Sequence, residues 1–306
     1  MPLIYSIIAP LIIISSVAVY QGEAFTAIET ARLLQNCMLI AGIGTLLQLY
    51  PIWKIGSGLP VVMGISFTFL AACLATASQD YGIMVGAIIV GGCFEGVLGL
   101  TAKYWRKIIS PIVSACVVVS IGLSILNVGV SSFGSSSAYP LGSWQNLLVA
   151  TITLAAALSG GVFGCSPITS FSQNVGLISM THVVNRFTIM FGALAMILGG
   201  LFPPFGAFFT TLPDCVLGGC TVIMFGSIMM SGVRMMHDAG MDQRNTLIAA
   251  TSICLGVGVT QADGFFNELP SFIGDIFAGN MVAGVFVVGL ILDLCLPRDP
   301  SHYTSM

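Results

Sequence analysis

The stretch from Gly160 to Arg186 decides the fold of this chain and reads GGVFGCSPITSFSQNVGLISMTHVVNR. Its first part contains glycines and Pro167, which interrupt the hydrogen-bond ladder of a helix. The residues after them carry amide and hydroxyl side chains, which are costly in hydrocarbon unless they find partners. Irregular backbone at membrane depth is tolerated only where it is buried in protein or lines a cavity. We therefore predict a discontinuous membrane segment that presents polar groups at its break, as in transporters.

The composition indicates that this segment belongs to a membrane protein. Of the 306 residues, 56% are hydrophobic and 7% are charged, and the mean hydropathy is +1.01. A soluble domain carries about 25% charged residues. The nine basic residues are scattered, with no patch beyond Lys103, Arg106 and Lys107. We therefore predict a multi-pass protein in a lipid bilayer and no nucleic-acid partner.

The cysteines and histidines indicate neither a metal site nor a catalytic centre. The nine cysteines show no ligand spacing, and most of them lie in apolar runs, where cysteine acts as a small core residue. The histidines His182, His237 and His302 are far apart in the sequence. No arrangement of a nucleophile and a base is present in the sequence. We predict no metal, no cofactor and no enzymatic activity.

Apolar segments that could cross or enter a membrane recur along the chain. The predicted segments are 3–19, 31–50, 59–78, 82–101, 108–127, 147–164, 187–204, 208–232, 246–261 and 279–296, with an amphipathic interfacial helix at 265–277. Residues 128–143 are predicted to form an uncharged loop. Pro203 and Pro204 are predicted to close a span before a short outer loop. The expected fold is an all-α polytopic membrane protein with about ten or eleven apolar segments.

A second interrupted segment lies at residues 59–78, where Pro60 and Gly64 break an apolar run. We predict an extended piece that leads into a helix, and a kinked span is the alternative. Paired interrupted segments in two halves are typical of inverted-repeat transporters. We predict an N-terminal repeat over residues 1–150 and a C-terminal repeat over residues 151–306.

The basic residues predict an orientation, because cytoplasmic loops carry an excess of lysine and arginine. Lys54 and the basic cluster at 103–107 are expected inside, and the uncharged loop 128–143 is expected outside. Only one apolar run follows before the polar segment, and a single crossing would place Arg186 outside. Either residues 147–170 dip into the membrane and return, or part of the chain is missing internally.

The polar segment also carries a motif that spans much of its second half. It runs Gln173-Asn174-x-Gly176-x-x-x-x-Thr181, is preceded by Phe171-Ser172 and is followed by Asn185-Arg186. This motif resembles the signature of the nucleobase:cation symporter-2 family, the nucleobase–ascorbate transporters. The glutamine at its first position resembles the xanthine and urate branch, and the stretch at 59–78 resembles the third span of the family. His182 departs from the small residue that usually follows the threonine, which puts local packing or selectivity in question.

The resemblance implies an inverted-repeat fold of fourteen spans and a nucleobase permease. The expected substrate is a purine-type base such as xanthine, urate or a close analogue. The resemblance also implies coupling to protons and a place in the cytoplasmic (plasma) membrane, and it leaves a homodimer open. An uncoupled facilitator and an inactive permease remnant are the rival hypotheses.

Compared with that family, the chain is expected to be shortened and its C-terminal repeat to be incomplete. The seventh and eighth spans of the family have no apparent counterpart, with a seam near residues 151–157. In the family the eighth span supplies a glutamate that binds the base and is tied to proton coupling, and no residue replaces it here. We therefore expect weak transport or none from the chain as it stands.

The residues expected to bind the substrate are Gln173, Phe67, Phe171 and Ser172, with Asn174, Gly176 and Thr181 in support. Gln173 offers two donors and an acceptor to the lactam or imide edge of a base. The alternative for Gln173 is an amide that joins two helices. Phe67 and Phe171 could hold a flat heterocycle between their rings, although taken singly each is more often a core residue. We predict that Phe67 and Gln173 lie close together at the membrane midplane.

Three acidic residues lie within the predicted spans, and one of them, Asp214, lies near a span end and is expected to be interfacial. Glu95 is deep in the span 82–101 and is a candidate for a proton-linked role, because carboxylates inside a membrane are costly and usually functional. The alternative is that Glu95 pairs with Lys103 or with a serine near the cytoplasmic end. Asp293 lies near the end of the last span and is expected to be interfacial.

Overall fold

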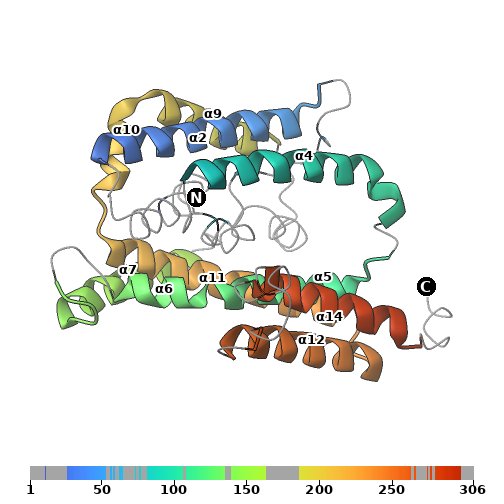
Figure 1. Cartoon of the computed structure of the whole chain (residues 1–306). Coiled ribbons are helices and arrows are strands. Elements are labelled where there is room, and N and C mark those ends of the chain that lie inside the picture. The colour runs from blue at the N-terminus through green and yellow to red at the C-terminus, as the bar shows by residue number, and fades with distance from the viewer. Residues whose placement is uncertain are drawn as a thin grey trace. The chain divides into compact units, whose positions relative to one another are not determined.

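The structure is a computed structural model that describes most of the chain. The described residues are 11, 26–52, 56, 58, 62–64, 73, 76, 81–105, 108–134, 139–162, 186–262, 265–266, 274, 276–277 and 280–297. The long elements among them are all helices (Figure 1), which confirms the predicted all-α class.

The helices in chain order are α2 (Ala27–Leu49), α4 (Tyr81–Trp105), α5 (Pro111–Ser124), α6 (Leu126–Phe133), α7 (Trp144–Val162), α9 (Arg186–Leu201), α10 (Pro203–Thr210), α11 (Asp214–Asp238), α12 (Gln243–Gln261) and α14 (Met281–Cys295). Within the described part of the chain, four stretches are long and apolar enough to cross a membrane: Ile28–Leu49, Gly82–Thr101, Pro111–Phe133 and Cys215–Asp238. These stretches agree with the predicted multi-pass membrane protein.

Helix α2 begins with a capping box at Thr26. Thr26 Oγ1 accepts the Glu29 N–H at 3.3 Å, and the Glu29 carboxylate accepts the Thr26 N–H at 2.9 Å. This reciprocal pair satisfies two backbone donors at the start of the helix. The helix therefore begins four residues before the predicted span at residue 31.

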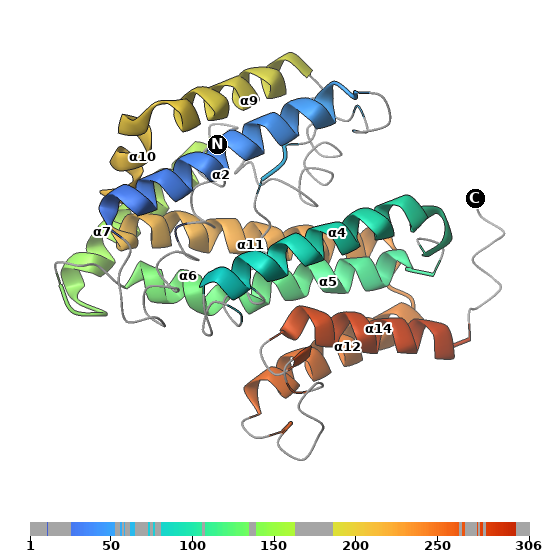
Figure 2. The ribbon, with the colours of Figure 1, turned by 45° about the horizontal axis from the view of Figure 1, so that its top comes forward.

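The first compact unit of the chain consists of Met1–Ala87 and Ile125–Ile228. Within it, α9 lies along α2 (Figure 2), and glycines allow the two backbones to approach closely. A Cβ atom on Gly42 would lie 2.9 Å from the Ala193 carbonyl oxygen. A Cβ atom on Gly200 would lie 2.9 Å from both the Gln35 carbonyl oxygen and the Leu39 nitrogen. The short helix α10 packs against the same two helices.

The second compact unit consists of Ile88–Ser124 and Met229–Met306, and its core forms where α5, α12 and α14 pack together. Ile112 and Cys116 of α5, Ile248 of α12 and Val285 of α14 are buried in this core. Helix α5 is apolar on nearly all sides, which is typical of a helix enclosed by others.

Two predicted loops are shorter than expected. The uncharged loop at 128–143 was predicted wrongly at its start, because α6 continues to Phe133. Pro203 and Pro204 do not lead into a loop, because α10 begins at Pro203. Proline suits the first turn of a helix, where its missing N–H would have no intrahelical partner.

Helix α11 also differs from its predicted span at 208–232, because it runs from Asp214 to Asp238. Arg234 and His237 therefore lie in the helix and not in the following loop. The helix ends just before Gly240, which has a φ of +84° that favours glycine.

Residues 147–170 were predicted either to dip into the membrane and return or to lie beside an internal deletion, and helix α7 bears on the first alternative. Helix α7 is continuous to Val162, so no turn of a re-entrant hairpin lies within residues 147–162. Residues 163–170, the predicted span 3–19 except residue 11, and most of the interfacial helix at 265–277 lie outside the described residues. The two repeats also remain a prediction, since the compact units each combine residues from both halves of the sequence.

The close approach of α2 and α9 predicts a sharp difference between two glycines. Gly200→Ala should lower the thermal stability of the purified protein in detergent by an amount corresponding to about 1–3 kcal/mol, because the new methyl group meets the backbone of α2. Gly226→Ala in α11 is the control, because no atom lies within 4 Å of its added Cβ. Equal melting temperatures for the two variants would contradict the proposed packing.

Candidate functional site

The residues predicted to bind or support the substrate lie outside the described part of the chain. They are Phe67, Phe171, Ser172, Gln173, Asn174, Gly176 and Thr181. Their roles stay predictions. The structure does describe residues 62–64, 73 and 76 within the first interrupted segment, and the helices α7 and α9 on either side of the second.

The first interrupted segment is not helical where its break was predicted. Residues 62–64 adopt no regular structure, whereas Cys73 and Thr76 are helical. These described residues agree with an extended piece that leads into a helix. Backbone groups in such a piece lack the internal partners of a helix and must find others where water is excluded.

Thr45 of α2 provides those partners for Met63. Its Oγ1 accepts the Met63 N–H at 2.8 Å and lies 3.3 Å from the Met63 carbonyl oxygen. The same oxygen lies 2.7 Å from the Ala41 carbonyl oxygen one turn back in α2. A threonine hydroxyl has a single proton, so it donates to one of the two carbonyls at a time. Thr45 is fully buried.

Apolar contacts attach the same segment to the α2–α9 pair. Val62 is buried and packs with Ala41 of α2 and Met196 of α9. Gly44 lies beside Met63, because a Cβ atom added there would make an ordinary contact of 3.5 Å with Met63 Cβ. Helix α9 itself begins at Arg186, where the second interrupted segment ends in the sequence. Helices α2 and α9 therefore hold residues of the first segment, and α9 directly follows the second segment in the sequence.

Glu95, the candidate for a proton-linked role, lies in the middle of α4 with its side chain exposed. The alternative of an ion pair with Lys103 is not found, although both residues are described. The described side chains of α4 from Val85 to Thr101 are all exposed. In a membrane, this face would lie against lipid or another apolar segment.

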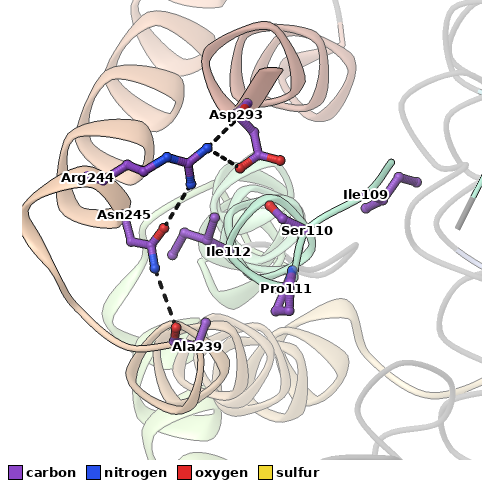
Figure 3. A pocket seen from close by; sticks show the side chains of 8 residues that line it. All are labelled: Ile109, Ser110, Pro111, Ile112, Ala239, Arg244, Asn245 and Asp293. Atoms are coloured by element: carbon purple, nitrogen blue, oxygen red, sulfur yellow. Dashed lines mark hydrogen bonds and ion pairs between the residues drawn. The ribbon is translucent and has the colours of Figure 1, made fainter. Parts of the chain in front are cut away.

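A second polar cluster lies where α12 begins and α14 ends, and Figure 3 shows it. Arg244 Nη2 donates to Asp293 Oδ1 at 2.8 Å and to the Asp293 carbonyl oxygen at 2.7 Å. Arg244 Nε donates to the Leu296 carbonyl oxygen at 3.4 Å. The guanidinium thus neutralises a buried carboxylate and satisfies carbonyls at the end of α14. We call Arg244, Asn245 and Asp293 the helix-end clamp.

Asn245 extends the clamp to α11. Its Nδ2 donates to the Gly240 carbonyl oxygen at 2.9 Å, just after α11 ends, and its Oδ1 accepts from Arg244 at 3.4 Å. Its backbone N–H donates to the Asp242 carboxylate at 2.9 Å, which caps the start of α12. The clamp therefore connects the ends of three helices.

A pocket of about 280 Å³ lies beside the clamp. Its lining consists of Ile109, Ser110, Pro111, Ile112, Ala239, Arg244, Asn245 and Asp293 (Figure 3). The carboxylate of Asp293 is fully buried, and the Ser110 hydroxyl oxygen is buried without a hydrogen-bond partner. Because its charged and amide groups bind helix ends, we interpret the cluster as structural. Among the described residues, no group of three or more His, Cys, Asp or Glu side chains could hold a metal ion.

The clamp could not be predicted from the residues taken singly. Asp293 was predicted to be interfacial, whereas its side chain is fully buried. The available signal was the acidic residue itself, since a carboxylate in an otherwise apolar helix needs a partner. Nothing local identified that partner as Arg244, which lies 49 residues earlier.

Comparisons with known proteins place the chain among permeases. The family described as "Permease family" matches residues 4–160 and 157–265. The xanthine permease XanQ of Escherichia coli (strain K12) is 26% identical over 396 residues, which cover 89% of this chain and 85% of that protein. The xanthine permease XanP of the same strain is 24% identical over 413 residues, covering 94% and 89%. The xanthine permease of Bacillus subtilis (strain 168) is 26% identical over 395 residues, covering 92% and 88%.

The alignments are much longer than this chain. The XanQ alignment spans 396 positions, whereas 89% of the 306 residues here is about 272 residues, so about 120 positions have no residue from this chain. The two ranges matched by the family meet at residues 157–160, within α7. This junction lies next to the seam expected near residues 151–157.

The helix-end clamp predicts that removing Arg244 alone destabilises the protein more than removing both Arg244 and Asp293. Arg244→Met should destabilise the purified protein by about 3–5 kcal/mol, because it removes the guanidinium that neutralises the buried Asp293 carboxylate. The double variant Arg244→Met, Asp293→Leu should recover most of that loss in a thermal or denaturant melt. Lys103→Met, at an exposed position of α4, is the control. Full stability of Arg244→Met alone would contradict the clamp.

Proposed function

The chain belongs to the Permease family, and from this premise we propose that it is a secondary active transporter of a purine-type nucleobase. The proposed substrate is xanthine, urate or a close analogue, and the proposed coupling ion is the proton. The proposed location is the cytoplasmic (plasma) membrane, with the lipid bilayer as its surroundings. We keep a homodimer as an open part of the proposal.

The observation that carries this proposal is the position of the motif within the family match. The range 157–265 contains the whole motif from Phe171 to Arg186. Three aligned relatives bear the name xanthine permease. A glutamine at Gln173 suits such substrates, because a xanthine or urate ring displays several carbonyl acceptors and N–H donors.

In this proposal, the two interrupted segments share one substrate site. Gln173 hydrogen-bonds the edge of the base, with Ser172 beside it. Phe67 and Phe171 stack against its faces, which is favourable for a flat aromatic ring. Asn174, Gly176 and Thr181 support the broken backbone of the second segment. The attachment of residues 62–64 to α2 supports a fixed position for the chain entering the Phe67 segment.

The family resemblance assigns coupling to a glutamate in an eighth span that has no apparent counterpart here. Glu95 is the carboxylate that we propose for a proton-linked role, since it lies within an apolar span, although it does not occupy the place of that glutamate. An uncoupled chain would still move its substrate down a gradient.

A shortened, uncoupled or inactive permease is the second candidate, and the alignments favour it. About 120 positions of the XanQ alignment have no residue here, and the family match divides at residues 157–160. The missing spans would otherwise pack beside the motif. Without them, Gln173 would lack partners, and an unpaired buried amide costs about 1–3 kcal/mol.

Uptake by the purified chain in liposomes tests both candidates. Labelled xanthine should enter saturably, and an inward proton gradient should increase uptake if transport is coupled. Gln173→Ala should reduce uptake at least about tenfold, because the amide that binds the base is lost. Gln243→Ala is the matched control, because this glutamine lies exposed at the start of α12.

The outcomes separate the candidates. Xanthine uptake that is the same with and without a proton gradient would indicate a facilitator. Uptake of uracil without competition by purines would contradict the substrate. A lack of uptake by the unmodified chain would favour the shortened, inactive permease, whereas uptake at the level of a full-length relative would exclude it.

A further inference from the structure

We propose that Thr45 is a positioning residue for substrate binding: its hydroxyl fixes the non-helical backbone at Met63 and thereby sets the affinity for the purine base. This inference rests on the proposed function. It adds a residue on α2 that lies outside both interrupted segments and outside the motif.

The backbone of Met63 is hydrogen-bonded to the side chain of Thr45. Its N–H donates to Thr45 Oγ1 at 2.8 Å, and its carbonyl oxygen lies 3.3 Å from the same atom. In a membrane protein, backbone groups outside a helix have few other partners. Thr45 is fully buried, so water does not reach its side chain. The Thr45 hydroxyl therefore accepts the Met63 N–H, while its single proton is shared between the carbonyl oxygens of Ala41 and Met63.

The apolar contacts of Val62 hold the same stretch of backbone as the hydrogen bond of Met63. Val62 is buried and packs with Ala41 and Met196, and Gly44 lies beside Met63. These contacts hold residues 62–63 on the α2–α9 pair, while Thr45 fixes the direction in which the backbone leaves Met63. Loss of the Thr45 hydroxyl would leave the apolar contacts of Val62 but remove the acceptor of the Met63 N–H.

Met63 lies only a short distance along the chain from Phe67, the residue proposed to stack against the base. Phe67 follows Met63 by four residues, and four extended residues reach at most about 14 Å. A shift at Met63 is therefore passed along a short connection. Stacking and edge hydrogen bonds depend on position within about 1 Å, so a small shift should weaken binding.

A second buried threonine distinguishes this role from ordinary helix packing. Thr221 of α11 is 1% exposed, and its Oγ1 donates to the Gly218 carbonyl oxygen at 2.9 Å within its own helix. Thr221→Val therefore removes a buried hydroxyl from the same compact unit without releasing a separate segment. It is the matched control for Thr45→Val.

The test combines two measurements on purified protein carrying Thr45→Val, Thr45→Ser or Thr221→Val. The first is hydrogen exchange in a peptide that covers residues 62–64. The second is equilibrium binding of xanthine and of urate. Thr45→Val should speed exchange at Met63 about tenfold, because a buried hydrogen bond is lost. It should also weaken binding about tenfold with a melting temperature close to that of Thr221→Val.

Thr45→Ser keeps the hydroxyl and should restore both exchange and affinity to within about twofold of the unmodified chain. Unchanged exchange at Met63 in Thr45→Val would overturn the positioning role. Weaker binding that Thr45→Ser fails to restore, or that Thr221→Val reproduces, would also overturn it. If the unmodified chain binds neither purine, the proposed function fails, and the exchange measurement still decides the role of Thr45 at Met63.

Discussion

Backbone groups that leave a helix inside a membrane protein must find hydrogen-bond partners, and Met63 is the described residue where this constraint is clearest. Thr45 meets the constraint with a single buried hydroxyl. The rest of the proposed site depends on it, since an interrupted segment is useful only if its break is held in one place. Val62 adds apolar contacts with Ala41 and Met196 at the same point, and Gly44 lies beside Met63.

The two compact units are stabilised in different ways. In the first, α2 and α9 approach closely at Gly42 and Gly200, so that small residues form the contact. In the second, an apolar core around α5 is joined to the Arg244–Asp293 pair at the ends of the helices. The close contact supports precise placement of the proposed substrate segments, whereas the clamp holds helix ends together.

Hydropathy predicted the long helices well. The spans at 31–50, 82–101 and 279–296 correspond to α2, α4 and α14 with differences of a few residues. Prolines and serines misled the prediction of loops, because Pro203 can begin a helix and the serines near Phe133 can continue one. For the candidate site, the motif identified Gln173 from residue types alone. The bonds of Thr45 to Met63 and of Arg244 to Asp293 could not be predicted, because they join residues 18 and 49 positions apart.

The central claim is that the two interrupted segments meet at one substrate site. Cross-linking of Phe67→Cys to Gln173→Cys, in a chain whose nine native cysteines are replaced, tests this claim most directly. A thiol reagent about as long as the width of a base should join the pair. Gly44→Cys with Met63→Cys is the positive control, since a Cβ on Gly44 would lie 3.5 Å from that of Met63. A cross-link in the control pair alone would contradict the account.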